Sequence, residues 1–197
     1  MIVDINQKDS LSQFEKSLFR STLEDDKIIS FPTDTVYGLG VNGFSAKAVE
    51  RLYRLKGRDE TKPLILMVDS IDKMLPYIKK PNDKTMNLIK QSWPGAVTFI
   101  LPFDNSSSLF FSRNQSNTLG LRIPNHTLLL DLLSYFAFPL VTTSANKAGM
   151  SPIQYPEMIE ATFSDDDLPI ILDGGLLNNN PSRIIQCVDD DLKVLRP

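Results

Sequence analysis

The stretch P-T-D-T-V-Y-G-L-G at residues 32–40 concentrates side chains that could bind and orient a polar substrate. Thr33, Asp34, Thr35 and Tyr37 follow a short apolar run that ends at Pro32, and polar groups at strand ends are where open α/β sheets build ligand sites. Gly38 and Gly40 would let a ligand approach the backbone closely. The alternative is a β-turn that the Thr and Asp side chains merely cap, and the residue types alone leave both readings open.

Three cations follow within seven residues, at Lys56, Arg58 and Lys62. Residues 47–62 hold six Lys/Arg and three Asp/Glu, whereas the whole chain has a formal net charge of −3. Arginine can grip two oxygens at once and lysine supplies a point charge, so the loop would suit a triphosphate. A solvated charged loop is the alternative, although apolar sequence on both sides indicates a position at the rim of a sheet.

A second polar cluster follows the apolar run at 140–141 and contains Thr142, Ser144, Asn146 and Ser151. Hydroxyls, an amide and loop N–H groups at a strand end can face an anion. A Ser- or Asx-turn that ends the strand would use the same residues.

Arg122 lies in the otherwise apolar segment G-L-R-I-P. A buried arginine is costly unless it is paired, so it either faces solvent at an edge or meets a carboxylate of the protein or of a ligand. Bidentate binding of a substrate carboxylate would account for it.

The composition excludes several kinds of site. One histidine, His126, nearly rules out a His-centred triad or a multi-His metal site, and one cysteine, Cys187, rules out an internal disulfide. There is no P-loop, no G-x-G-x-x-G fingerprint and no carboxylate cluster that would identify metal ligands. No apolar run could span a membrane and no secretory signal is present, so a cytoplasmic location is the simplest expectation.

The elements that must position these residues alternate between helices and strands, then end in strands. This order predicts one α/β domain, residues 1–197, with a mixed or largely parallel sheet. Helices are predicted at 9–24 (capped by Asp9 or Ser10), 46–55 (capped by Ser45 and stopped by Gly57), 70–77, 82–91 and 126–136. Strands are predicted at 27–31, 64–68, 96–101, 118–123, 140–143, 170–172, 183–188 and 192–195, with a loop at 104–117.

Several motifs in order resemble the YrdC-like family, and within it the single-domain TsaC type. They are P-T-D-T-V-Y-G-L, K-G-R at 56–58, K-P-L-I, W-P-G, L-R-I-P and S-A-N at 144–146. The resemblance covers about residue 10 to Arg196.

This resemblance implies a twisted, mixed open sheet with flanking helices around a large concave cavity. It implies synthesis of threonylcarbamoyl-AMP and pyrophosphate from L-threonine, bicarbonate and ATP, with Mg²⁺ accompanying the nucleotide. The product would pass to a tRNA threonylcarbamoyl transferase complex, and a weak direct contact with tRNA is left open.

The family pattern also implies roles for individual residues. Lys56 and Arg58 would be catalytic, stabilising the triphosphate and the developing charge. Threonine would be bound by Thr35, Arg122, Thr142 and Ser182. ATP would be bound by Arg58, Lys62, Thr118, Ser144, Asn146, Ser151 and Arg196.

The chain departs from the family pattern at three places: Met67 stands where many relatives have histidine, Arg183 and Gln186 replace the Thr and Asp of P-S-T-[IV]-[IV]-D, and the 104–117 loop has no match. A YciO-like paralogue with another substrate, an RNA-binding module and a carbamoyl-phosphate-handling transferase domain are the alternatives. The negative net charge disfavours RNA binding, and the intact K-G-R and S-A-N motifs disfavour the paralogue.

Overall fold

The computed structural model describes residues 1–60, 62–104, 109, 117–163, 168–188 and 191–197. Its described strands form one ten-stranded sheet in the order β1-β8-β2-β3-β7-β4-β6-β5-β9-β10. The predicted 104–117 loop falls almost entirely outside the described residues.

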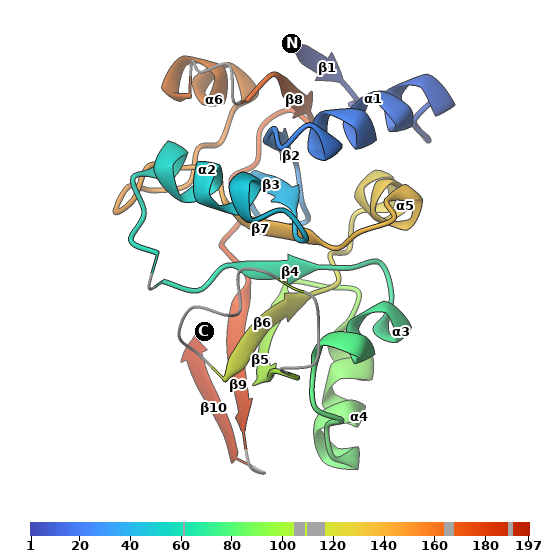
Figure 1. Ribbon diagram of the computed structural model, residues 1–197, viewed down its shortest axis with the longest axis vertical. Coiled ribbons are helices and arrows are strands. Elements are labelled where there is room, and N and C mark those ends of the chain that lie inside the picture. Colours follow the sequence, from blue (N-terminus) through green and yellow to red (C-terminus); the bar gives the residue numbers. More distant parts are fainter. Residues whose placement is uncertain (61, 105–108, 110–116, 164–167, 189–190) are drawn as a thin grey trace.

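The sheet runs the length of the molecule, with β1 at one end and β10 at the other (Figure 1). The strands are β1 (Ile2–Asp4), β2 (Ile29–Phe31), β3 (Gly38–Asn42), β4 (Ile65–Met67), β5 (Val97–Pro102), β6 (Thr118–Arg122), β7 (Leu140–Ser144), β8 (Ile170–Asp173), β9 (Arg183–Val188) and β10 (Asp191–Arg196). The helices are α1 (Gln13–Glu24), α2 (Ala46–Lys56), α3 (Ile71–Met74), the 3₁₀ turn η1 (Leu75–Tyr77), α4 (Asp83–Ser92), α5 (Thr127–Tyr135) and α6 (Pro156–Thr162).

The prediction of a mixed α/β sheet is confirmed. β4 pairs in parallel with β6 and β5 with β9, whereas β3 and β4 both pair antiparallel with β7. The sequence prediction missed β1, β3 and α6. β3 was missed because it begins Gly-Leu-Gly, and glycine is poor in strands unless the backbone needs the space.

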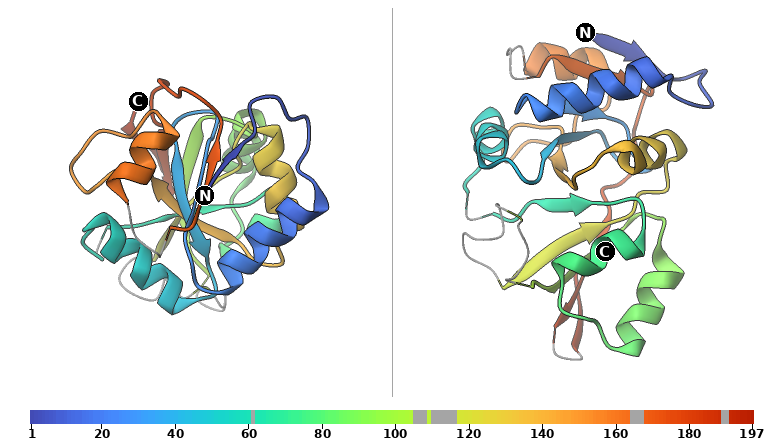
Figure 2. Two further views of the ribbon diagram at one scale, coloured as in Figure 1. Left: turned by 90° about the horizontal axis from the view of Figure 1, so that it is seen from above. Right: turned by 45° about the vertical axis from the view of Figure 1, so that its right-hand side comes forward.

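The two faces of the sheet bury separate hydrophobic cores. One core packs α2, α3, α4 and α6 against residues such as Leu66, Leu121 and Val141. The other packs α1 and α5 against residues that include Phe31 and Leu140. Figure 2 shows α1 and α5 on one side of the strands and α2 on the other. Because the second core involves only part of the sheet, the rest of that face is available to line a cavity.

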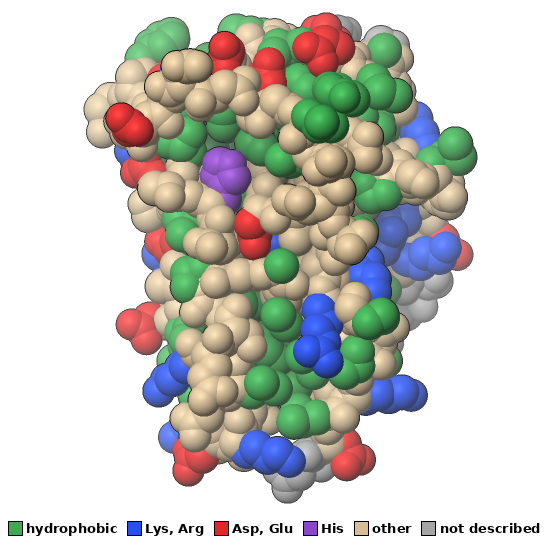
Figure 3. All heavy atoms as spheres, turned by 180° about the vertical axis from the view of Figure 1, so that it is seen from behind, with side chains coloured by type: hydrophobic (Ala, Val, Ile, Leu, Met, Phe, Trp, Pro, Cys, Tyr) green, Lys and Arg blue, Asp and Glu red, His purple; other side chains and the backbone are tan. Residues whose placement is uncertain are grey.

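No helix in the described part of the chain is long and apolar enough to cross a membrane. Basic, acidic and hydrophobic side chains are interspersed over the face seen in Figure 3.

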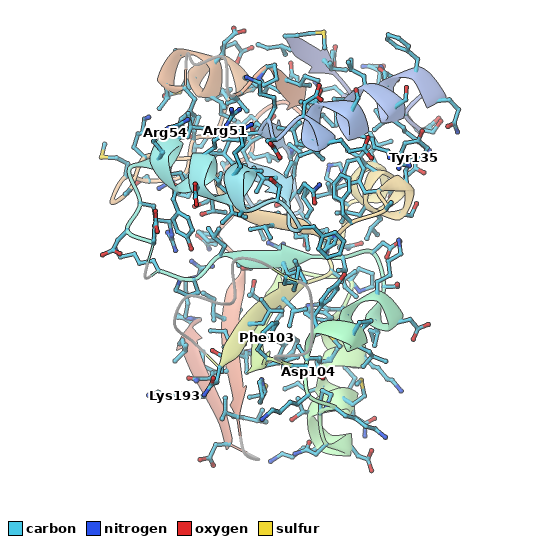
Figure 4. The ribbon with its side chains drawn as sticks, in the orientation of Figure 1. Arg51, Arg54, Phe103, Asp104, Tyr135 and Lys193 are labelled. Carbon is cyan, nitrogen blue, oxygen red and sulfur yellow. The ribbon has the colours of Figure 1, made fainter. Side chains whose placement is uncertain are left out.

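Helix α2 begins and ends as the sequence predicts. The Ser45 hydroxyl accepts from the Ala48 N–H at 3.2 Å, and Gly57 ends the helix in the left-handed conformation at φ 60°. Figure 4 shows Arg51 and Arg54 on this helix, and neither belongs to its buried face. The left-handed conformation of Gly57 ends the helix, so the loop that carries Arg58 and Lys62 (the cationic loop) begins directly after α2.

The predicted cap of the first helix is wrong. Ser12, rather than Asp9 or Ser10, caps α1, because Glu15 completes a capping box by accepting from the Ser12 N–H at 2.9 Å. The acidic residue three positions beyond Ser12 is the signal that selects it.

Candidate active site

A cavity of about 450 Å³ occupies the open part of the α1/α5 face. Its floor follows from the register of the sheet. Met67 on β4 pairs with Arg122 on β6, and Thr98 on β5 pairs with Ile184 on β9. The antiparallel register of β5 and β6, continued by one residue, places Thr98 beside Arg122. One row of side chains thus crosses four strands, all facing the cavity.

Most of the predicted site residues meet in this cavity. Its lining includes Thr35, Arg58, Thr118, Arg122, Thr142, Ser144, Asn146, Ser182 and Arg196. The cationic loop after α2 and the hydroxyl-rich end of β7 therefore converge on one hollow, although almost 90 residues separate them in the sequence. Lys56, Lys62 and Ser151 are not part of the lining, although Lys62 and Ser151 each adjoin residues that are.

Arg122 is buried, with 3% of its surface exposed, and meets the protein carboxylate that the sequence left as one alternative. Its Nη2 donates to Asp34 Oδ1 at 2.6 Å, its Nη1 to Thr35 Oγ1 at 2.8 Å and its Nε to Gly95 O at 3.1 Å. Burial lowers the pKa of Arg122, and the neighbouring Asp34 opposes that shift. Three of its five N–H groups are engaged by described residues, and the other two have no partner among them.

The P-T-D-T segment forms a turn and also contributes Thr33 and Thr35 to the cavity lining. Thr33 Oγ1 donates to Val36 O at 2.8 Å and accepts from the Thr35 N–H at 3.0 Å, which is the turn chemistry. The Thr35 hydroxyl lies 2.9 Å from Thr33 Oγ1, and because Thr33 already donates to Val36, Thr35 donates in this pair. The turn therefore fixes Thr35 where it can accept from Arg122.

The glycines of this segment have a different role from the one expected. A Cβ on Gly40 would lie 2.6 Å from a Phe31 ring carbon, and one on Gly38 would lie 2.8 Å from another. The missing side chains therefore make room for the Phe31 ring. Gly38 still lines the cavity, whereas Gly40 does not.

Lys56 lies behind the cavity wall, with 1% of its surface exposed. Its ammonium donates to Ser144 O and, at 3.1 Å, to Asn146 Oδ1. Burial and, to a smaller extent, the charge of Arg58 lower the pKa of Lys56 to about 7. In this geometry Lys56 acts on the cavity by holding two residues that line it.

The side-chain amide of Asn146 makes four hydrogen bonds with described residues. Its Oδ1 accepts from Lys56 and, at 2.6 Å, from the Ser144 hydroxyl, while its Nδ2 donates to Lys147 O at 2.8 Å and Met150 O at 2.7 Å. The amide therefore ties the end of β7 to the loop that carries Ser151.

Arg58 has unused hydrogen-bonding capacity in the cavity. Its Nη2 donates to Pro63 O at 2.9 Å, but its Nε is buried and has no hydrogen-bond partner in the described part of the chain. Burial lowers the pKa of Arg58. Leaving a buried donor on a charged group unsatisfied is unfavourable, so the group is suited to an anionic ligand.

The C-terminal strands complete the cavity with a hydroxyl pair and a third arginine. Thr98 Oγ1 and Ser182 Oγ lie 2.8 Å apart, and Arg196 Nε donates to Ser182 O at 2.8 Å. Burial lowers the pKa of Arg196. Sequence reasoning missed Thr98, although its position as the one polar residue in V-T-F-I-L is the same signal that singled out Arg122.

The departures from the family pattern fall in different places. Met67 lines the cavity, whereas Arg183 and Gln186 on β9 do not. Ser182, which keeps the family residue, does line it.

The described residues do not provide a metal-binding cluster. No group of three or more of their His, Cys, Asp or Glu side chains could hold a metal ion. Asp34, the carboxylate nearest to Arg122, is engaged by that arginine.

Comparisons with known proteins extend over nearly the whole chain. Residues 21–197 match the protein family Sua5_yciO_yrdC, which is described as "Telomere recombination". The threonylcarbamoyl-AMP synthase of Bacillus subtilis (strain 168) is 31% identical over 196 residues, which are 99% of this chain and 56% of that protein. The synthase of the same name from Photorhabdus laumondii subsp. laumondii is 34% identical over 174 residues, which are 87% of this chain and 91% of that protein.

The crystal structure of P. abyssi Sua5 complexed with L-threonine superposes with a TM-score of 0.88 at 26% identity. The superposition covers 100% of this chain and 57% of Sua5. The chain thus spans little more than half the length of Sua5 and of the Bacillus relative, and nearly the full length of the Photorhabdus relative.

Proposed function

The chain belongs to the Sua5/YciO/YrdC family, and we propose that it is a nucleotidyltransferase that makes L-threonylcarbamoyl-AMP and pyrophosphate from L-threonine, bicarbonate and ATP. The observation that carries this proposal is the convergence of Arg58, Arg122 and Arg196 with strand-end hydroxyls in one cavity. Such a lining suits two anionic substrates held side by side, a carboxylate and a polyphosphate. The relatives named threonylcarbamoyl-AMP synthase and the threonine complex of Sua5 support the same assignment.

The reaction needs positioning more than covalent participation by the protein. The threonine amine adds to CO₂ or bicarbonate, giving a carbamate with loss of a proton or of water. A carbamate oxygen then forms a bond to the α-phosphorus of ATP, the bond from that phosphorus to the bridging oxygen of the β-phosphate breaks, and pyrophosphate leaves. Charge stabilisation dominates phosphorus-centred transfers of this type. A cavity lined by arginines and hydroxyls fits that requirement.

At the amino-acid end, Arg122 would bind the threonine carboxylate with its two remaining N–H groups, beside Thr35. Thr142 and Ser182 would supply further contacts. The Thr142 hydroxyl already donates to Ile65 O at 3.2 Å, so it would present lone pairs to the substrate.

At the nucleotide end, Arg58 would stabilise the triphosphate and the charge that develops as pyrophosphate leaves. Arg196, Ser144 and Thr118 would bind the remaining polar groups of ATP. Lys56 would act as a positioning residue, because its ammonium is directed at Ser144 and Asn146 and not at the cavity. Lys62 and Ser151 would reach ATP only from the rim.

Mg²⁺ would enter with the nucleotide, bound mainly by its phosphates. The described residues offer no group of three or more side chains that could hold the ion by themselves. The product would be consumed by a tRNA threonylcarbamoyl transferase. The chain would therefore act in the cytoplasm together with that enzyme.

The test is to incubate the purified chain with ATP, L-threonine and bicarbonate and to measure pyrophosphate while each substrate is omitted in turn. Dependence on all three, with threonylcarbamoyl-AMP detected by mass spectrometry, is the expected result. Pyrophosphate or phosphate release with ATP alone would indicate a different enzyme. Salt-sensitive RNA binding without turnover would favour an RNA-binding module.

A further inference from the structure

The Thr98–Ser182 hydroxyl pair contacts Arg196, so it connects Ser182, which is expected to bind threonine, with a residue expected to bind ATP. Both side chains line the cavity and both are nearly inaccessible to solvent, with 1% of Thr98 and 3% of Ser182 exposed. Thr98 comes from β5, whereas Ser182 immediately precedes β9, so the pair joins segments 84 residues apart. Two buried hydroxyls are unfavourable without partners, and here each partners the other.

Arg196 determines which hydrogen bonds the Ser182 hydroxyl can still make. Its Nε donates to Ser182 O at 2.8 Å, and its Nη2 approaches Ser182 Oγ at 3.3 Å. An arginine cannot accept a hydrogen bond, so Ser182 Oγ must be the acceptor in the second contact. One residue thus holds the guanidinium by both its carbonyl and its hydroxyl.

The hydrogen count of the pair then determines what it can offer a ligand. The two hydroxyls carry two protons, and the bond between them uses one. No other described acceptor takes the second proton, so it remains available to the cavity that both residues line. If Thr98 donates to Ser182, both lone pairs of Ser182 are occupied, by Thr98 and Arg196, and the Ser182 proton must point elsewhere.

Arg196 donates to Ser182 and has no carboxylate partner among the described residues. Burial lowers its pKa, and no described acid opposes that shift. A hydroxyl proton and an uncompensated guanidinium therefore stand next to each other. This combination favours an oxygen anion that bridges them.

We propose that Thr98 is a positioning residue for both substrates: its buried hydroxyl orients Ser182 towards threonine and, through Ser182, holds Arg196 against ATP. The inference rests on the proposed function, because it takes the two ligands from there. The inference implies that binding of the two substrates is coupled through Thr98. A change at Thr98 alters the affinity for threonine and the affinity for ATP together, without a direct contact between Thr98 and ATP.

The experiment compares the wild-type chain with Thr98→Val, which keeps the side-chain shape and removes the hydroxyl, and with Thr98→Ser, which keeps the hydroxyl. Thr22→Val is the matched control, because Thr22 is a buried threonine on α1 whose hydroxyl bonds to Leu18 O, outside the cavity. For each variant, KM for threonine, KM for ATP and kcat are measured from pyrophosphate release. ATP binding is measured separately by calorimetry without threonine, and folding by thermal denaturation.

Thr98→Val is expected to raise both KM values roughly tenfold, the usual effect of losing one hydrogen bond near a charged ligand, with a smaller change in kcat. Thr98→Ser should restore both KM values to within about threefold of wild type, since the hydroxyl is what orients Ser182. Thr22→Val should leave both unchanged. In a Ser182→Ala background, Thr98→Val should have little further effect, because Thr98 acts through Ser182.

Equal KM values in Thr98→Val and wild type would overturn the inference, and so would additive effects of Thr98→Val and Ser182→Ala. A purely structural role would also contradict the inference. It would appear as less folded protein in Thr98→Val, with wild-type KM values in Thr98→Ser and unchanged ATP binding. If the wild-type chain released no pyrophosphate but bound ATP, and Thr98→Val bound it more weakly, the proposed function would fail while the role of Thr98 at the Arg196 end would stand.

Discussion

Arg122 and Asp34 form a nearly buried ion pair, 2.6 Å between Nη2 and Oδ1, that joins β6 to the turn after β2. The carboxylate offsets part of the cost of burying the guanidinium and sets its orientation. The arginine is therefore held in place without a ligand. None of the described residues engages its two remaining N–H groups, which under the proposed function would bind the threonine carboxylate.

The first prediction concerns that pair. Asp34→Asn should raise KM for threonine about tenfold and lower the free energy of unfolding by about 1–3 kcal/mol, because a neutral amide holds the guanidinium less firmly. Substrate kinetics and urea denaturation measure the two effects. Asp72→Asn, a change at an exposed carboxylate of α3, is the control and should alter neither. An unchanged threonine KM in Asp34→Asn would show that the pair does not orient Arg122.

The second prediction concerns Arg58. Arg58→Ala should slow turnover by roughly a hundredfold or more, since it removes a cation from a site where negative charge develops. The measurement is kcat for pyrophosphate release at saturating substrates. Arg20→Ala is the control, because Arg20 lies on α1 outside the cavity and pairs with Glu24. Near-normal pyrophosphate release by Arg58→Ala would refute the assigned role.

The third prediction concerns pH and Lys56, whose pKa burial lowers to about 7. An unfolded lysine has a pKa of about 10.4, so between these values the unfolded state binds more protons than the folded state. Stability should therefore rise with pH through this interval. The cost of burying the charge is full below pH 7 and falls steadily until the unfolded lysine deprotonates as well. Lys56→Met removes the titrating group and with it this rise.

Urea denaturation at pH 7, 8 and 9 checks the effect. The difference in unfolding free energy, wild type minus Lys56→Met, should increase with pH. Lys90→Met, at an exposed lysine of α4, should show no such trend. A difference that shrinks with rising pH would mean that Lys56 is stabilised as an ammonium by its two acceptors.

The fourth prediction concerns packing beneath the site. Gly40→Ala should destabilise the fold by about 1–3 kcal/mol, because its Cβ would lie 2.6 Å from the Phe31 ring and 3.0 Å from Leu140. Phe31→Leu should relieve part of that loss, so the double variant should be more stable than the sum of the single effects. Thermal and urea denaturation measure the cycle. Strict additivity would contradict the packing explanation.

The sequence determined the type of the fold and most of the site's chemistry. Alternating helical and strand patterns predicted a mixed α/β sheet, and the caps at Ser45 and Gly57 predicted the ends of α2, because these signals are local. Arg122 was recognisable because a charge in an apolar strand requires a partner. The lack of a second histidine or cysteine limited the chemistry to cations, hydroxyls and carboxylates.

Tertiary structure decided which partner each of these groups has. Only the sheet order, which sets β4 between β7 and β6, brings the loop after α2 to the end of β7. Whether Arg122 meets a protein carboxylate, and whether Lys56 faces the cavity or the strand behind it, depends on side-chain packing between segments about 90 residues apart. Thr98 gained its significance the same way, since its partner comes from a segment that no local pattern connects to β5. Local propensities fix the elements, but long-range pairing and burial determine which side chains share a site.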